Sequence, residues 1–487
     1  MRRLAPFPAG AVSVVAACKV VLGASVLGRY GWQRDELYYV VAARHLAPGY
    51  FDFPPVTALL GAGMRLIAGE SRIGLRALAL LAGAGFVVVT ALIARELGGS
   101  RRAQTIAAVC AALMPVLLGV NTLFQPVSFD FLLEAVLLWL AVRLSFEGRR
   151  VYWILVGVVL GVGVETKYTM GVLAACLLVA AAIFRRDLLR LGDLAIALGI
   201  ALLLAAPNIV WEAQHNWETV RFLTTNGQSA TSETRPQFLV NLLTNANVAL
   251  IPVWFVGFRR LHRDRATRWL AWGTGLVCLA YFVLGGKSYY AAPVFVLPLA
   301  AGSTWVDGWL VGARRIAITA VVVVALTLYA LPIAVPVLPI ATAVRWHVVK
   351  ARSDYQDELG WDSVADGVAH AEAVLRRAGT PAAAALAANY GEAGALDVLG
   401  RGRGLPPTVS GNMNYRYWRP ARIAAGPIVV VGYGPSMLGT LCSQWHVVAR
   451  VHVPYGVDNQ EAGQPIVTCT PRRPLYSSWK RLLDPSY

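Results

Sequence analysis

The stretch Gly31-Trp32-Gln33-Arg34-Asp35-Glu36-Leu37-Tyr38-Tyr39 follows the first long apolar segment of the chain, which covers residues 10–28. This position predicts that the stretch lies just beyond a membrane span. Two adjacent acids beside an arginine are costly at that depth unless they have a task, because ionisable groups close to a bilayer are expensive. We therefore expect the rest of the chain to hold this stretch at a membrane surface and to bring a substrate to it.

The composition is that of a membrane protein. Of the 487 residues, 57% are hydrophobic and 15% are charged, and the mean hydropathy is +0.55. Soluble globular chains average about 25% charged residues. The net charge of +17 does not indicate a nucleic-acid partner, because the arginines stand in short clusters between apolar runs and form no continuous basic face. We expect membrane lipids as the surroundings and no nucleic acid.

About eleven apolar segments are candidate spans, since a span needs about 20 residues. They are centred near residues 10–28, 77–95, 104–121, 127–143, 151–164, 168–184, 192–211, 238–257, 268–284, 290–306 and 315–336. Beyond about residue 340 the apolar runs shorten and helix and strand signals alternate, which predicts a small α/β domain. The expected fold class is an all-α polytopic membrane bundle over residues 1–340, with a long loop at 29–76 (the first loop), followed by an extracytoplasmic α/β domain over residues 341–487 (the C-terminal domain).

Several elements outside the spans have clear local signals. Helices are predicted at 37–46, 56–68 and 362–377, and strands at 383–388, 427–431 and 446–453. Arginines crowd every second loop, so the positive-inside rule places those loops and the N-terminus in the cytoplasm. An odd number of spans then leaves the C-terminal domain outside, where Cys442 and Cys469 could form a disulfide. The first loop, the turn 121–130 and the loop 212–237 share this outer face.

Acidic residues are the first candidates for chemistry. Asp35 and Glu36 could provide a general base at the membrane surface, because a partly shielded carboxylate has a raised pKa and can accept a proton. The alternative is a helix cap paired with Arg34. Asp130 opens the fourth span from the same face, either as a second acid or as a cap. Glu134, one turn deeper, requires a partner that the sequence does not identify.

Two lysines stand in short loops on the outer face, whereas the other loops use arginine. Lys167 follows Glu165-Thr166, and Lys287 precedes Ser288-Tyr289-Tyr290. A lysine beside tyrosines at the headgroup level is suited to bind a phosphate, and the alternative is snorkelling to lipid headgroups. No Cys-x-x-Cys or His-x-x-x-His pattern is present, so no metal site is predicted.

Two polar segments are less specific. His215 and Asn216 stand between Trp211 and Trp217, and they serve either a sugar site or the structure of the loop. The motif Asn389-Tyr390-Gly391-Glu392-Ala393-Gly394-Ala395 and the loop Ser410-Gly411-Asn412-Met413-Asn414-Tyr415 either line an acceptor site or connect elements. The glycines of the first motif are predicted to permit a tight turn.

Five features taken together resemble a known family. They are the acid pair after the first span, the helix opened by Pro54-Pro55, the acid at the start of the fourth span, the Thr-Lys-Tyr turn and the run Lys-Ser-Tyr-Tyr-Ala-Ala-Pro. Over residues 10–310 the chain is similar to the bacterial family-39-like glycosyltransferases of the GT-C superfamily, which are related to protein O-mannosyltransferases and to the lipid A aminoarabinose transferase. The resemblance implies a GT-C bundle in the bacterial inner membrane, with the N-terminus cytoplasmic.

The same resemblance implies a reaction. A polyprenyl-phosphate-linked sugar would be transferred with inversion to an acceptor glycan, lipid or protein, with Asp35 as the base and Asp130 as a second acid. The aminoarabinose transferases have a lysine just before Pro-Pro, whereas this chain has Phe53, preceded by Asp52. The donor phosphate is therefore assigned to Lys167, Lys287, Arg44 and Tyr289. His215, Asn216, Tyr38 and Asp52 are the candidates for binding the acceptor or the donor sugar.

The implied chemistry requires no cofactor, because the leaving group is a phosphate monoester on a lipid. A divalent ion on Asp35, Glu36 and Asp130 is the alternative, since some superfamily members use one. Two other functions stay open. One is a polytopic transporter or flippase of a lipid-linked substrate, which the buried Glu134 favours, although the halves of the chain show no repeat. The other is a non-catalytic assembly partner in which the C-terminal domain acts.

Overall fold

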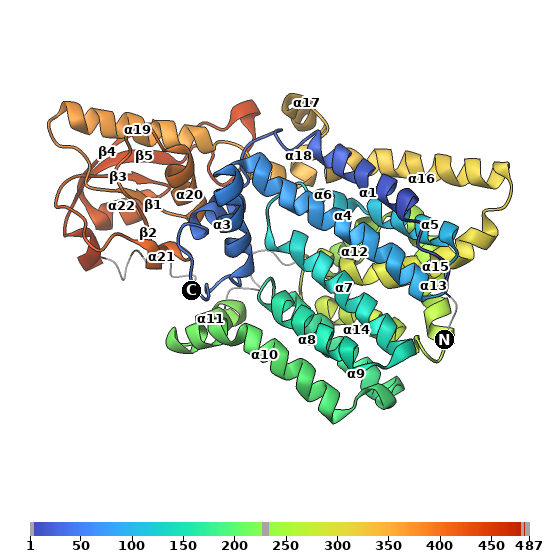
Figure 1. Ribbon diagram of the computed structural model, residues 1–487. Helices are drawn as coiled ribbons and strands as arrows, with labels where there is room; N and C mark the ends of the chain where they lie inside the picture. The colour runs from blue at the N-terminus through green and yellow to red at the C-terminus, as the bar shows by residue number, and fades with distance from the viewer. Residues whose placement is uncertain (1–3, 226–232, 479–481, 483–487) are drawn as a thin grey trace.

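The computed structural model describes residues 4–225, 233–478 and 482 (Figure 1). A helical bundle makes up the larger part, and a small sheet domain lies at one end of it. The helices of the bundle are α1 (Ala9–Ala24), α4 (Arg72–Glu96), α5 (Arg101–Ala112), α6 (Pro115–Val120), α7 (Pro126–Glu147), α8 (Arg150–Val164), α9 (Thr169–Phe184), α10 (Leu191–Gln214), α11 (Glu218–Thr225), α12 (Arg235–Asn245), α13 (Ile251–Arg263), α14 (Arg268–Leu284), α15 (Val296–Trp309) and α16 (Ala313–Ala334).

Within the described residues, four helical segments are long and apolar enough to cross a membrane. They are α4, α10, the segment Ser288–Trp309 and α16, and a fifth arises if α12 and the bent segment Val248–Arg263 count as one span. Shorter apolar helices include α1, α8, α9 and α14. The chain is thus a multi-helix membrane protein, but the expected count of about eleven spans is not confirmed. One predicted span, 104–121, is broken between α5 and α6, where Pro115 begins a new helix.

The C-terminal domain contains a five-stranded sheet with the order β2-β1-β3-β5-β4. β1 (Ala385–Ala387) pairs in parallel with β2 (Thr408–Ser410) and with β3 (Ile428–Val431), whereas β5 (Pro465–Pro471) runs antiparallel to β3 and to β4 (Cys442–Arg450). The α/β expectation for this part is therefore confirmed. Two strands were not predicted, because β2 has only three residues and β5 includes two prolines and two threonines.

Helices cover both faces of this sheet. α19 (Trp361–Arg377) packs on β3, β4 and β5, and α20 (Tyr390–Leu399) packs on β1 and β2. α22 (Pro435–Leu441) contributes to a separate apolar cluster with Val430 and Val467. The disulfide Cys442–Cys469 joins the paired strands β4 and β5. The predicted pairing of these two cysteines is thus confirmed.

The first loop is folded into the C-terminal domain. It contains α2 (Arg34–Ala42) and α3 (Val56–Ala68), the second of which has the predicted bounds. Leu37 and Val41 of α2 belong to the same buried apolar cluster as Val364 of α19 and Val429 of β3. Figure 1 shows α3 at the end of the bundle that is nearest the sheet domain, where it packs on α2 and on α4. The core of the C-terminal domain therefore extends through residues that are more than three hundred positions earlier in the chain.

Two glycines explain how closely these parts approach. A Cβ on Gly394 would lie 2.9 Å from the Cβ of Leu37, and one on Gly391 would lie 2.7 Å from the Cγ of Arg34. Both glycines lie inside α20, and neither has a positive φ. The prediction that they permit a tight turn is therefore wrong: they remove side chains where α20 rests against α2.

Candidate active site

Asp35 lies in the first turn of α2, where its half-buried carboxylate faces the C-terminal domain. The hydroxyl of Tyr390 donates a hydrogen bond of 2.8 Å to its Oδ1. The Gln33 side chain caps the helix by accepting from the Asp35 amide at 2.7 Å, so the carboxylate itself is not the cap. Burial raises the pKa of Asp35, and the hydrogen bond from Tyr390 and the positive charges of Arg34 and Lys287 oppose that rise. The site therefore holds an acid that ionises above its ordinary range and stays partly accessible.

Glu36 has a different environment, although it is the next residue. Its two oxygens accept from Nε and Nη2 of Arg76 at 2.8 and 2.7 Å, and both side chains are at most 1% exposed. The amides of Gln33 and Phe124 also donate to this carboxylate. These four donors assign Glu36 to holding α2, α4 and the turn at Phe124 together. We therefore do not retain Glu36 among the proposed catalytic acids.

Asp52 lies in the segment between α2 and α3. Its Oδ1 accepts a hydrogen bond of 3.1 Å from the Tyr38 hydroxyl and another from the side-chain amide of Asn414. Asn414 also donates to the Tyr38 oxygen, from its side chain at 2.6 Å and from its backbone at 3.0 Å. Burial raises the pKa of Asp52 to about 7, with a further contribution from the negative charge of Asp35. The two predicted sugar ligands, Tyr38 and Asp52, thus form one cluster with the C-terminal domain.

The two lysines converge on a tyrosine pair. Both ammonium groups lie 5.9 Å from the centre of the Tyr289 ring, and Lys167 lies 4.7 Å from the centre of Tyr290. The two rings pack edge to face with centres 4.6 Å apart. Glu233 accepts hydrogen bonds from the amide and the hydroxyl of Ser288, which fixes the turn after Lys287. The structure therefore gathers the predicted phosphate ligands Lys167, Lys287 and Tyr289 into one cationic and aromatic group.

Asp130 lies in the first part of α7 and is buried. Thr169 donates a hydrogen bond of 2.7 Å to its Oδ2, whereas its Oδ1 has no hydrogen-bond partner among the described residues. Glu134 is also buried, one turn further along the same helix. Both acids are coupled electrostatically to Lys167. The positive charge of Lys167 therefore offsets part of the cost of burying these two acids.

Arg44 occupies another position. Its Nε and Nη2 donate to the two oxygens of Glu70 at 2.8 and 2.6 Å, and its Nη1 donates to the carbonyl of Asp397 at 3.1 Å. Arg401 makes a second ion pair with Glu70 at 3.0 Å. These contacts join the first loop to α20 and engage the guanidinium that was expected to hold the donor phosphate.

His215 and Asn216 lie at the end of α10. The His215 ring stacks on Trp211 with centres 4.0 Å apart and shares a hydrogen bond with the Trp211 carbonyl. Asn216 has a φ of +57°, which asparagine tolerates better than most residues. These features shape the turn into α11. Nearby, Arg416 of the C-terminal domain pairs with Glu218 at 3.1 Å, so this loop also contacts that domain.

The structure does not gather Asp35, Glu36 and Asp130 into one ligand set. Among the residues that it describes, no group of three or more His, Cys, Asp or Glu side chains is arranged to hold a metal ion. Glu36 cannot serve as a metal ligand together with the other two acids, because its carboxylate is paired with Arg76. A divalent ion on these three acids is therefore not supported by their positions.

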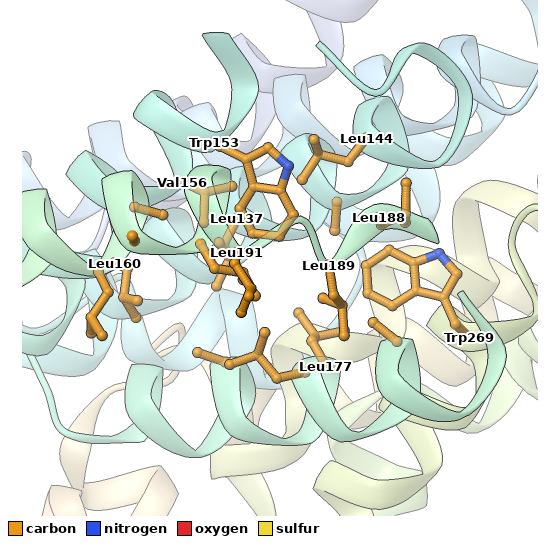
Figure 2. Close-up of a pocket in the computed structure, with 18 residues that line it drawn as sticks. Leu137, Leu144, Trp153, Val156, Leu160, Leu177, Leu188, Leu189, Leu191 and Trp269 are labelled. Carbon is orange, nitrogen blue, oxygen red and sulfur yellow. The ribbon is translucent and has the colours of Figure 1, made fainter. Parts of the chain in front are cut away.

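A cavity of about 450 Å³ lies elsewhere in the bundle (Figure 2). Its walls come from α7, α8, α9 and α10, from the segment between α9 and α10, and from Trp269 of α14, and Trp153 and Trp269 lie on two sides. The walls are almost entirely apolar. The part of α7 that lines it is Leu137–Leu144, which is the end away from Asp130. The residues that line the cavity thus include no acid or base.

Sequence reasoning missed three residues that build the site. Arg76 had a detectable signal, because an arginine at the end of an apolar helix requires a partner. Asn414 stands in a polar loop for which two roles stayed open, lining an acceptor site or connecting elements. Tyr390 stands in the noted glycine motif, but its contact with Asp35 spans 355 positions of sequence, and no local pattern predicts such a pairing.

Comparisons with known proteins agree with this architecture. Residues 52–211 match the family model of dolichyl-phosphate-mannose-protein mannosyltransferases, which covers about a third of the chain. No curated protein matches in sequence. The solved structure of ArnT from Cupriavidus metallidurans in the apo state superposes with a TM-score of 0.62 and 16% identity, over 94% of this chain and 98% of that one. The chain therefore has the fold of ArnT.

Two further structures share this fold. ArnT from Cupriavidus metallidurans bound to undecaprenyl phosphate superposes with a TM-score of 0.60 and 16% identity, over 95% of this chain and 98% of that one. The mycobacterial arabinofuranosyltransferase AftD gives a TM-score of 0.55 and 16% identity, over 97% of this chain but 41% of AftD. The ArnT-like fold thus extends over nearly the whole chain, including the C-terminal domain.

Proposed function

We propose that this protein is an inverting membrane glycosyltransferase that moves a sugar from a polyprenyl-phosphate donor to an acceptor. The observation that carries the proposal is the position of Asp35, a partly accessible carboxylate with a raised pKa that lies near Lys287. A base next to cations that suit a phosphate is what a direct displacement requires. The family match over residues 52–211 and the ArnT-like fold support the same class of reaction.

The reaction is a single displacement at the anomeric carbon. Asp35 accepts the proton of the acceptor hydroxyl or amine as that group attacks. The new bond forms on the face opposite the leaving group, while the bond between the anomeric carbon and the phosphate oxygen breaks. The electron pair of that bond leaves with the polyprenyl phosphate. Lys167 and Lys287 stabilise the additional negative charge of this phosphate, and Tyr289 holds the two ammonium groups in place.

The orientation follows from independent features. The arginine-rich loops favour a cytoplasmic N-terminus. The disulfide Cys442–Cys469 supports an extracytoplasmic position of the C-terminal domain, because disulfides persist in oxidising compartments. We propose that the protein resides in a bacterial inner membrane and that transfer takes place at the outer surface, to a glycan, lipid or protein acceptor.

The test measures binding and turnover separately. The purified protein is incubated with undecaprenyl phosphate and with polyprenyl phosphates that carry mannose or arabinofuranose. Asp35→Asn is compared with the wild type, and Asp458→Asn, which removes an exposed carboxylate of the C-terminal domain, is the matched control. We expect all three proteins to bind undecaprenyl phosphate, and only the wild type and the control to release it from a donor.

Two outcomes would contradict the proposal. If the wild type does not bind undecaprenyl phosphate, the donor assignment is wrong. If it binds the lipid-linked sugars without cleaving them, and moves them across the bilayer of a vesicle, the chain is a flippase. The buried pair Asp130 and Glu134 is the feature that would then require a new explanation.

A further inference from the structure

Two side chains of the C-terminal domain reach the carboxylates of the first loop. Tyr390, the first residue of α20, donates to Asp35. Asn414, just before α21 (Tyr415–Trp418), donates to Asp52 and to Tyr38. We propose, on the basis of the function given above, that the C-terminal domain completes the transfer site, with Tyr390 as the positioning residue of Asp35 and Asn414 as the positioning residue of Asp52.

The position of Tyr390 is fixed from several sides. Its amide donates to Oδ1 of Asn412 at 3.0 Å, and Asn389 caps α20 by accepting from the amide of Glu392 at 2.9 Å. The Tyr390 ring packs against the Tyr38 ring with centres 5.0 Å apart. The nearby Gly391 brings the start of α20 against Arg34. The backbone and the ring of Tyr390 are therefore both held in place, and this fixes the position of the hydroxyl beside Asp35.

The contacts of Asn414 are equally specific. Its side-chain amide lies between the Tyr38 hydroxyl and the Asp52 carboxylate, and its Oδ1 accepts from the Phe51 amide at 3.4 Å. A leucine at this position would have nearly the same shape, but it could not donate the two side-chain hydrogen bonds to Tyr38 and Asp52. Asn414 and Tyr38 together therefore orient Asp52.

Several charged and titratable groups around Asp35 also influence its pKa, so they must be considered when Tyr390 is replaced. On its own helix Asp35 has Arg34 and Tyr39, and Asp52 follows in the same loop. From other elements it has Lys287, Tyr289, Asp354, Asp357 and Tyr390. The Tyr390 hydrogen bond favours the ionised form of Asp35, because a donor stabilises the negative charge. Removing it makes the base harder to ionise without changing any of the other charges.

The experiment compares wild type, Tyr390→Phe and, as a matched control, Tyr455→Phe, which changes a 55% exposed tyrosine of the same domain. Infrared titration of the carboxyl band, with Asp35→Asn as the blank, follows the ionisation of Asp35 without any turnover. We expect Tyr390→Phe to move that titration upward by about one pH unit. The acid limb of donor cleavage should move by the same amount, while Tyr455→Phe resembles the wild type.

Asn414→Leu provides the second variant. We expect the infrared titration of Asp52, with Asp52→Asn as the blank, to move upward, and donor cleavage to fall at least about fivefold at neutral pH. The inference is overturned if both titrations and both cleavage profiles equal those of the wild type. A wild type that cleaves no donor overturns the proposed function instead, and the two infrared titrations still decide whether the C-terminal domain positions the carboxylates.

Discussion

Arg76 and Glu36 form a two-pronged ion pair in the interior of the protein, with N–O distances of 2.8 and 2.7 Å. Arg76 also donates to the carbonyls of Leu27 and Gly31, at 3.0 Å each, and pairs with Glu358 of the C-terminal segment at 3.3 Å. One guanidinium thus joins the end of α1, the start of α2 and the entry to α19.

We expect Glu36→Gln to act on stability rather than on chemistry. Breaking a buried ion pair by removing one partner costs up to about 3–5 kcal/mol, and the remaining pair of Arg76 with Glu358 should reduce that cost. The variant should unfold at a clearly lower temperature in detergent, whereas Asp35→Asn should unfold close to the wild type. A Glu36→Gln protein that is as stable as the wild type but inactive would return Glu36 to the catalytic residues.

Activity and folding stability should depend on pH in opposite directions. Asp35 must be ionised to act as a base, and burial raises its pKa. Asp52 has a pKa raised from 3.8 to about 7. We therefore expect kcat/KM to fall as the pH drops, because Asp35 takes up its proton at a pH above the ordinary range of an aspartate; donor cleavage at limiting donor measures this.

The sign for stability follows from proton binding. Between pH 3.8 and about 7 the folded protein holds the Asp52 proton more tightly than the unfolded chain does. Stability must then decrease as the pH rises through this window. Thermal unfolding of Asp52→Asn should show less of this decrease than the wild type does. An unchanged slope would mean that Asp52 does not hold its proton in the folded state.

The lysine pair should determine the affinity for the lipid phosphate. Replacing Lys167 or Lys287 by methionine removes a charged donor, so we expect the Kd for undecaprenyl phosphate to rise about 10–100-fold for each. Lys350→Met, which changes an exposed lysine of α18 (Val348–Ala351), is the control. Equal affinities for all four proteins would show that the phosphate binds elsewhere.

The disulfide should stabilise the C-terminal domain. Cys442 and Cys469 are 27 positions apart, and closing a loop of this size contributes about 3–4 kcal/mol in the chain-entropy model. Cys442→Ser combined with Cys469→Ser should lower the unfolding temperature of the domain in oxidising buffer. The wild type should show the same loss after reduction. If reduction changes nothing, the pairing does not form in the purified protein.

The glycine contact between α2 and α20 can be tested with a matched pair. A methyl group at Gly394 would meet Leu37 at 2.9 Å, whereas one at Gly439 of α22 would meet nothing within 4 Å. We expect Gly394→Ala to reduce donor cleavage by pushing α20 and its Tyr390 away from Asp35, and Gly439→Ala to be neutral. Equal activities would show that the contact between the helices yields without affecting the site.

Much of the fold could be predicted from local sequence. The bounds of α3, the start of α19 within one residue and three of the five strands follow from apolar periodicity and from Pro and Gly signals. The convergence of Lys167, Lys287 and Tyr289 was also expected, because loops on one face of a bundle lie close together. The spans were less predictable, since α7 carries Asp130, Glu134 and Arg143 within a largely apolar helix.

The rest depends on contacts between distant segments. Asp35 and Glu36 look equivalent in sequence, but only Glu36 faces Arg76, and only Asp35 faces Tyr390. The sequence suggests that Arg44 is free to bind a phosphate, whereas in the structure its guanidinium contacts Glu70 and Asp397. Local sequence patterns carry no signal for such pairings, because each of them is decided by how the first loop folds and packs on α4 and on the C-terminal domain.

The shared core of α2 and the C-terminal domain also sets the order of biosynthesis. A ribosome delivers the first loop early, but Val364 and Val429, which bury Leu37, emerge only when most of the chain has been inserted. Such long-range contacts cannot form before both partners exist. In the newly made bundle, α2 therefore lacks its packing partners until the C-terminal domain has been synthesised. Under the proposed function, Asp35 is held by Tyr390 only after the C-terminal domain has been made and folded, and we expect an unfinished chain not to cleave the lipid-linked donor.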